Sequence, residues 1–170
     1  MKKWIAMMAA VLLAVSALAG CGDKTIGGTE SKTASAAENK YYFESQGVKF
    51  AMNDEAADIL KVLGETETKK IPSCAHQGED TVYYYDDYGY ELETYTVDDV
   101  EYISCVWFSS DAVSTPEGLS IGDSEDKIET LYGEKQGDAS AYIYKDANTT
   151  LTILTENGAV SSIQYSAIVE

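Results

Sequence analysis

The chain has 170 residues, of which 29 are acidic and 12 basic, so its formal net charge at pH 7 is −17. All of the basic residues are lysine. Nucleic acid requires a basic footprint that neutralises its phosphates, so this composition argues against a nucleic-acid partner. A single histidine and three cysteines without a CxxC pair argue against zinc and haem sites, and we expect no metal and no cofactor.

Residues 1–20 have the three parts of an export signal. Lys2 and Lys3 give a positive start, and an apolar run from Trp4 to Leu18 follows that is short for a bilayer span. The segment closes on Leu18-Ala19-Gly20-Cys21, which resembles the lipobox of bacterial lipoproteins. The sequence therefore predicts that residues 1–20 are removed and that Cys21 carries a lipid. The alternative is an ordinary signal peptide, or an uncleaved anchor helix, with a chance cysteine.

The next segment, residues 21–40, is rich in Gly, Thr, Ser, Ala, Lys and Glu and has one large apolar residue, Ile26. Such a composition cannot bury a core, so it predicts a flexible tether behind the lipidated Cys21. Residues 41–170 are enough for one compact domain. We expect the membrane to be contacted through the lipid alone, because the acidic protein part is repelled by anionic head groups.

An internal repeat divides this domain into residues 41–114 and 115–170. Phe50 matches Leu119, Met52 matches Ile121, Asp54 matches Asp123 and Gly64 matches Gly133 when the chain is aligned with itself. A second block aligns Tyr85 with Tyr144, after an insertion in the first copy that contains Cys74 and His76.

Each copy is predicted to form a helix followed by three strands. Asp54 and Asp123 are expected to cap the helices at their N-termini, and Gly64 and Gly133 are expected to end them. The strand-like runs that follow are rich in Tyr, Thr, Val and Ile and cover 81–85, 90–96, 101–109, 141–144, 149–155 and 159–166. The predicted fold class is α+β, with two tandem helix-then-three-strand repeats whose helices pack on one face of an antiparallel sheet.

The opening Gly118–Ser124, the helix end Leu131–Glu134 and the strands after it resemble one repeat of a superfamily of known fold. This superfamily contains the β-lactamase inhibitor protein, which has two such units in tandem, and the small lipoprotein of the outer-membrane assembly machine. The stretch Pro72–Gly78 and the tyrosine-rich strand behind it also resemble uncharacterised surface lipoproteins of Gram-positive anaerobes. The resemblance covers about residues 47–168 and implies the fold, with the open sheet face as the surface that binds partners. The paired cysteines of the inhibitor's units are not matched here, so the resemblance does not imply inhibition of a β-lactamase.

Aromatic residues crowd the strands of the first copy. Tyrosine and tryptophan are the preferred hot-spot residues of protein interfaces. The candidate interface residues are Tyr83, Tyr85, Tyr90, Tyr95 and Trp107, and we expect those of them that face outwards to form one exposed patch. The alternative is that these tyrosines are good strand formers that lie half-buried.

Cys74 and Cys105 remain once Cys21 is used for the lipid, and a disulfide between them is allowed outside the cytoplasm. The alternative is two free buried thiols. His76 has no evident nucleophile partner, and the adjacent carboxylates of Glu79-Asp80, Asp86-Asp87 and Asp98-Asp99 are expected in solvated turns.

We therefore expect a non-catalytic, lipid-anchored protein on the extracytoplasmic side of the cell membrane that binds a protein partner. The alternative is an extracytoplasmic small-ligand-binding protein or enzyme with its site between the two repeats. A third reading is a purely structural component of the cell envelope.

Overall fold

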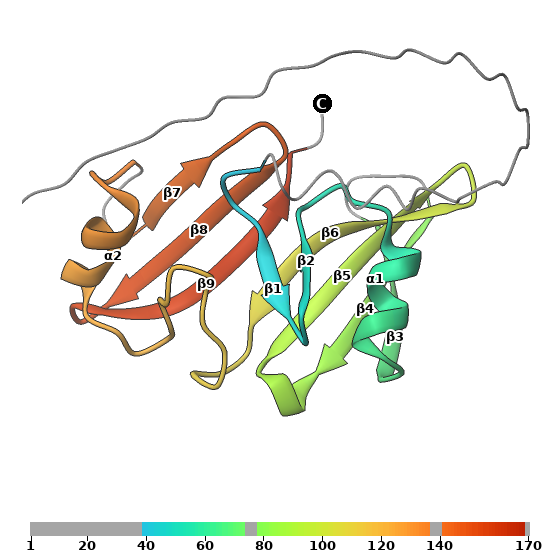
Figure 1. The fold of residues 1–170 in the computed structure, drawn as a ribbon, viewed down its shortest axis with the longest axis horizontal. Helices are drawn as coiled ribbons and strands as arrows, with labels where there is room; N and C mark the ends of the chain where they lie inside the picture. The colour runs from blue at the N-terminus through green and yellow to red at the C-terminus, as the bar shows by residue number, and fades with distance from the viewer. Residues whose placement is uncertain (1–38, 74–77, 137–140, 169–170) are drawn as a thin grey trace, which may run out of the picture. The chain divides into compact units, whose positions relative to one another are not determined.

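An antiparallel sheet of seven strands, in the order β3-β4-β5-β6-β9-β8-β7, forms the centre of the structure (Figure 1). The computed structural model describes residues 39–73, 78–136 and 141–168. The strands are β3 (Glu67–Pro72), β4 (Glu79–Tyr85), β5 (Tyr90–Val97), β6 (Val100–Phe108), β7 (Ala141–Lys145), β8 (Thr149–Glu156) and β9 (Ala159–Ala167). A one-turn helix, η1 (Asp86–Tyr88), joins β4 to β5.

Strand β5 shows the alternation of buried and less buried residues that is typical of a strand with one covered face. In β5, Tyr90, Leu92 and Thr94 are buried, while Glu91 and Glu93 point to the opposite side of the sheet. Since successive side chains of a strand lie on opposite faces, one face of the sheet is covered by the core and the other is not.

Strands β6 and β9 meet at the middle of the sheet and join its two halves. They pair through Cys105 with Ser166, Val106 with Tyr165 and Trp107 with Gln164. Beyond this short seam, the backbone of residues 53–54 bonds to Ile103 of β6, and that of residues 122–123 bonds to Val160 of β9.

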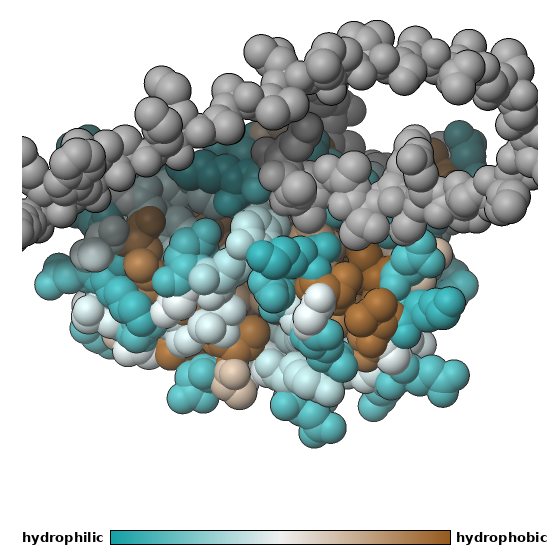
Figure 2. Space-filling view, in the orientation of Figure 1, coloured by the Kyte–Doolittle hydropathy of each residue, from teal (hydrophilic) through white to brown (hydrophobic). Residues whose placement is uncertain are grey.

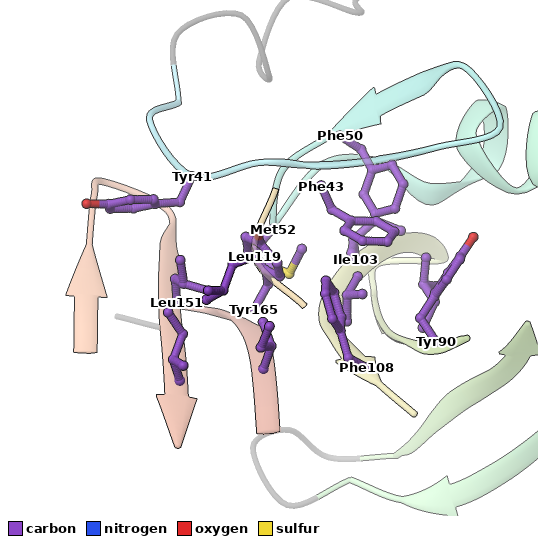
Figure 3. Packing of buried hydrophobic residues seen from close by; sticks show 14 of the residues in the cluster. Tyr41, Phe43, Phe50, Met52, Tyr90, Ile103, Phe108, Leu119, Leu151 and Tyr165 are labelled. Carbon is purple, nitrogen blue, oxygen red and sulfur yellow. The ribbon is translucent and has the colours of Figure 1, made fainter. Parts of the chain in front are cut away.

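The core of the covered face is built around a hairpin that the sequence analysis did not predict. Strands β1 (Phe43–Ser45) and β2 (Val48–Phe50) form a separate two-stranded sheet that lies in front of the main sheet in Figure 1. Phe43 is fully buried, and its ring centroid lies 4.9 Å from that of Tyr90, 5.7 Å from that of Phe108 and 6.0 Å from that of Tyr165 (Figure 3). One hairpin residue therefore packs on strands from both halves of the sheet.

The two helices, α1 (Ala56–Leu63) and α2 (Glu125–Tyr132), have eight residues each. Both end at the predicted glycines, Gly64 and Gly133, whose positive φ angles of 82° and 87° favour residues without a Cβ. Each helix end is then fixed by a tyrosine hydroxyl, because Tyr85 donates to the carbonyl of Gly64 at 3.2 Å and Tyr144 donates to that of Gly133 at 3.0 Å.

The N-caps predicted at Asp54 and Asp123 lie one residue before the observed capping positions. The capping positions are Glu55 and Ser124, and neither makes a side-chain capping bond. The carboxylates of Asp54 and Asp123 instead accept hydrogen bonds from the amides of the residues three positions earlier in the chain, at 2.8 and 2.7 Å. They stabilise the turn that leads into each helix rather than the helix itself.

The predicted fold class, α+β with two tandem helix-then-three-strand repeats, is wrong. The structure is mostly β, with a seven-stranded sheet, a two-stranded sheet and two short helices. The helix α1 is followed by four strands rather than three, because the inserted segment contributes β3 at the sheet edge. The helices are too short to cover the sheet, since α1 buries three residues and α2 only Ile128, and the β1–β2 hairpin supplies much of the remaining cover.

Candidate functional site: the open face of the sheet

The strand register assigns every sheet residue to one of two faces, because residues directly opposite each other in an antiparallel pair point the same way. The first, which we call the covered face, carries the core residues of β4, β5, β6, β8 and β9. The second face, which we call the open face, carries two neighbouring rows of side chains, and each row crosses all seven strands. The first row consists of Lys69, Val82, Glu93, Cys105, Ser166, Thr150 and Lys145. The second row consists of Glu67, Tyr84, Glu91, Trp107, Gln164, Thr152 and Ile143. Shorter rows flank these: Ile71, Asp80, Tyr95 and Tyr102 on one side, and Ser162, Leu154 and Ala141 on the other.

The described elements outside the sheet contribute apolar side chains to the core of the covered face. The β1–β2 hairpin contributes Phe43 and Phe50 to that core, α1 contributes Ile59, α2 contributes Ile128, and the segment between β6 and α2 contributes Leu119. Figure 2 shows this side of the molecule, on which hydrophilic and hydrophobic residues are interspersed. Within the described ranges, no helix or hairpin is therefore left to cover the open face.

Large apolar side chains lie exposed on the open face. Trp107 is 48% exposed and Leu154 is 40% exposed, while Tyr84, Tyr95 and Tyr102 are half-buried. Tryptophan and tyrosine are enriched among the residues that contribute most to binding at protein interfaces.

Hydrogen bonds and stacking hold these rings in place. Tyr95 stacks on Tyr102 with ring centroids 5.5 Å apart, and the Tyr95 hydroxyl donates to Asn53 Oδ1 at 3.0 Å. The indole Nε1 of Trp107 donates to Ser162 Oγ at 3.4 Å. The rings are thus ordered before any partner arrives, which lowers the entropic cost of binding.

Three of the five candidate interface residues do not face outwards. Tyr85 is 3% exposed and Tyr90 is fully buried, and both pack in the core of the covered face. Tyr83 lies half-buried on the same face, where its hydroxyl donates to Glu101 Oε1 at 2.8 Å, and burial raises the pKa of Tyr83. Only Tyr95 and Trp107 reach the open face.

Sequence reasoning missed Tyr84, Tyr102 and Leu154, which belong to the open face. A signal was present in β5, where Glu91 and Glu93 alternate with Tyr90. Acidic side chains point to water, so this alternation assigns Tyr90 to the core and, by register, Tyr84 to the opposite face.

Charge is distributed unevenly over the open face. The half formed by β3, β4, β5 and β6 carries four carboxylates, Glu67, Asp80, Glu91 and Glu93, against one lysine, Lys69. The half formed by β7, β8 and β9 carries hydroxyl and amide groups and Lys145 at its edge. Burial raises the pKa of Glu93, and the negative charge of Asp80 raises it further.

Cys105 lies between these two halves as a free, buried thiol that accepts a hydrogen bond from Gln164 Nε2 at 3.2 Å. Its predicted disulfide partner, Cys74, lies outside the described residues.

We expect Cys105 to be protected from alkylation in the folded protein. Burial raises the pKa of the Cys105 thiol to about 12, so almost no thiolate is present at pH 8. Iodoacetamide at pH 8, followed by peptide mapping with mass spectrometry, should leave Cys105 unmodified in the native protein and label it in urea. Rapid labelling of Cys105 under native conditions would contradict its burial.

The remaining candidate residues fall into two groups. Cys21 and His76 lie outside the described residues, whereas Asp86-Asp87 and Asp98-Asp99 lie exposed in turns. The expectation of a solvated turn is wrong for Glu79-Asp80, which begins strand β4 and has Asp80 buried. Within residues 39–73, 78–136 and 141–168, no group of three or more His, Cys, Asp or Glu side chains could hold a metal ion. The helices of these ranges are also too short or too polar to cross a membrane.

Comparison with known proteins adds no assignment: no protein-family model matches the chain, and no curated protein or solved structure matches it.

Proposed function

We propose that this chain is a lipid-anchored, non-catalytic protein of the extracytoplasmic side of the cell membrane that binds a protein partner on the open face of its sheet. The observation that carries the proposal is the open face itself, a surface that crosses all seven strands and presents Trp107 and Leu154 to solvent. The location is carried by the signal-like residues 1–20 and the cysteine that follows them.

The surface has the composition of an interface centre. Apolar and aromatic groups, Trp107, Tyr84, Ile143 and Leu154, are surrounded by hydroxyl, amide and carboxylate groups that can hydrogen-bond to a partner. The strands beneath are paired across the whole sheet, so the surface is suited to a partner that docks with little rearrangement.

No observation favours a small-molecule site between the two halves of the sheet. Among the described residues, the core side chains Phe43, Phe108, Leu119 and Tyr165 fill the region where the halves meet (Figure 3).

The binding surface can be tested with two matched double variants. Trp107→Ala with Leu154→Ser removes the two exposed apolar groups of the open face, whereas Val62→Ser with Tyr88→Ser removes two exposed apolar groups elsewhere, on α1 and in the β4–β5 connection. Each chain is immobilised and incubated with a membrane extract of the cells that make it, and the retained proteins are compared. We expect the first variant to lose a partner that the parent and the second variant retain, since hot-spot truncation costs about 2 kcal/mol or more. Equal retention by all three chains would contradict the proposal.

The location is tested separately with Cys21→Ala. Without the thiol there is no site for the lipid, so we expect the variant to leave the detergent-rich phase in a detergent-partition assay, or to accumulate with residues 1–20 attached. Partition identical to that of the parent would contradict lipid anchoring through Cys21.

A further inference from the structure

Exposed apolar side chains are concentrated on the open face. Among the described residues six large hydrophobic side chains are exposed, and four of them lie on this face: Trp107, Leu154, Val97 and Val100. Val97 and Val100 are opposite each other, two residues beyond the pair of Tyr95 and Tyr102, so they continue the same face to the turn between β5 and β6. Apolar groups gathered on one face are the pattern of a protein contact, whereas single scattered ones are ordinary.

These four groups follow a diagonal across the face. Val97 and Val100 lie at its β5–β6 end. Trp107 lies at the seam with β9, and Leu154 lies beyond the seam on β8. Ser162 connects the last two, because it is opposite Leu154 and accepts a hydrogen bond from the Trp107 indole at 3.4 Å. The apolar line therefore has Trp107 near its middle and aliphatic groups at both ends, so it can pair with a copy of itself whose ends are exchanged, as a two-fold dimer requires.

The polar groups of the face also differ between its two halves. The half formed by β3, β4, β5 and β6, which we call the acidic half, carries one lysine and four carboxylates: Glu67, Asp80, Glu91 and Glu93. The half formed by β7, β8 and β9, which we call the hydroxyl-rich half, carries hydrogen-bond donors: Thr150, Thr152, Ser162, Gln164 and Ser166. The charge of Lys145 at its edge is balanced by that of Glu156 at the end of β8.

This difference decides how two copies can face each other. Two acidic halves in contact would repel, which disfavours any arrangement that places equal halves together. Hydroxyl and amide groups, in contrast, donate strong hydrogen bonds to carboxylates. The charges therefore favour the same exchange of ends as the apolar diagonal does, with each acidic half on the hydroxyl-rich half of the other copy.

We propose that the protein partner of the open face is a second copy of this chain, in a two-fold dimer that places each acidic half on the hydroxyl-rich half of the other copy, with Trp107 near the axis. This inference rests on the proposed function and names its partner. Two sheets that pack face to face bury the side chains between them in one layer. The lipid anchor of the proposed function would hold the copies in one membrane and so raise their effective concentration.

The total charge of the chain gives this dimer a characteristic dependence on salt. Each copy has a net charge of −17, so two copies repel each other at a distance. Physiological salt screens such charges beyond about 8 Å, while the contacts within the interface remain. We therefore expect self-association to strengthen as the salt concentration rises, whereas binding to a cationic partner would weaken.

The arrangement can be tested by changing the charge of the hydroxyl-rich half. Sedimentation equilibrium of the full chain in a density-matched detergent measures the ratio of dimer to monomer. Thr150→Glu with Thr152→Glu should weaken dimerisation about tenfold or more, because the new carboxylates face the acidic half of the second copy. Thr150→Lys with Thr152→Lys should strengthen dimerisation about threefold or more, because the new ammonium groups face the same carboxylates.

The matched controls carry the same charges on the helices. Val62→Glu with Thr130→Glu, and Val62→Lys with Thr130→Lys, alter exposed positions of α1 and α2. Each should change the dissociation constant of the dimer less than about twofold, since charges outside the interface are screened. All chains share the lipid and the detergent, so a difference between the two positions comes from the open face. Circular dichroism melting checks that each variant is folded, and the lysine pair decides the test if the glutamate pair does not fold.

Three results would overturn the inference: a parent that is monomeric at every concentration, equal weakening by the two glutamate pairs, or a weaker dimer of Thr150→Lys with Thr152→Lys than of the parent. In the membrane-extract experiment the retained protein should be the chain itself. A different protein retained by a monomeric parent would assign the open face to that protein and also overturn the inference. The proposed function would survive all of these results, because it fails only if Trp107→Ala with Leu154→Ser retains the partner.

Discussion

Replacing Phe43 with alanine is expected to lower the free energy of unfolding by about 3–5 kcal/mol, as truncation of a buried phenylalanine does. The ring is fully buried among aromatic side chains of the hairpin and of both halves of the sheet. Its loss removes the contact that holds the β1–β2 hairpin on the covered face. Urea unfolding followed by circular dichroism measures the change.

A neighbouring position provides the control for Phe43. Glu44 lies on the same strand with its side chain exposed, and Glu44→Ala loses only a surface ion pair with Lys49. It should therefore change the stability by about 1 kcal/mol or less. If Phe43→Ala unfolded at the same urea concentration as the parent, the hairpin would not be part of the core.

The second large effect is expected at Tyr90. This side chain is fully buried and stacks on Tyr85 with ring centroids 5.2 Å apart, so Tyr90→Ala should cost about 3–5 kcal/mol. Trp107→Ala, in contrast, removes a ring that is 48% exposed and should cost about 1–2 kcal/mol. Thermal or urea unfolding of the two variants side by side measures the difference.

The comparison of Tyr90→Ala with Trp107→Ala also tests which side chains lie on the covered face and which lie on the open face. Glu91 lies between Tyr90 and Leu92 in β5 and directly opposite Trp107 in β6. If Tyr90 were exposed and Trp107 buried, the register would be shifted by one residue and every side chain would change face. A larger loss of stability in Trp107→Ala than in Tyr90→Ala would reveal such a shift.

Much of the strand pattern could be predicted from the sequence. The runs predicted at 81–85, 90–96, 101–109, 141–144, 149–155 and 159–166 fall on β4 to β9 with differences of one or two residues at the ends. The ends of both helices at Gly64 and Gly133 were also correct, because glycine is the residue best able to adopt a positive φ there.

Other elements gave weak local signals. The β1–β2 hairpin turns at Gln46 and Gly47, both with positive φ, and its strands have three residues each, which is too short for a clear alternation. The edge strand β3 contains two lysines and ends at Pro72. Lysine and proline on an edge strand prevent it from pairing with other chains. In the sequence, however, the same composition resembles a loop. The fold class failed for this reason, since the missing elements are all strands.

The candidate site was harder to predict than the strands. Three consecutive tyrosines, Tyr83 to Tyr85, must place rings on both faces, and local sequence does not show which ring is inward. That choice depends on pairing with β5 and on the helix end at Gly64, which receives the hydroxyl of Tyr85. Contacts between distant parts of the chain therefore decide which aromatic residues are available to a partner.

The order of the strands has a consequence for how the chain acquires its fold during synthesis. The centre of the sheet is completed by β9, the last of the strands to be made, whereas the hairpin that packs against it is the first. Until Tyr165 has emerged, β6 lacks its pairing partner and Phe43 lacks one of its neighbours. Such long-range closure is slow compared with local folding. A nascent chain of this topology therefore remains open until its final strand is released, and so it can be threaded through a narrow passage until that point.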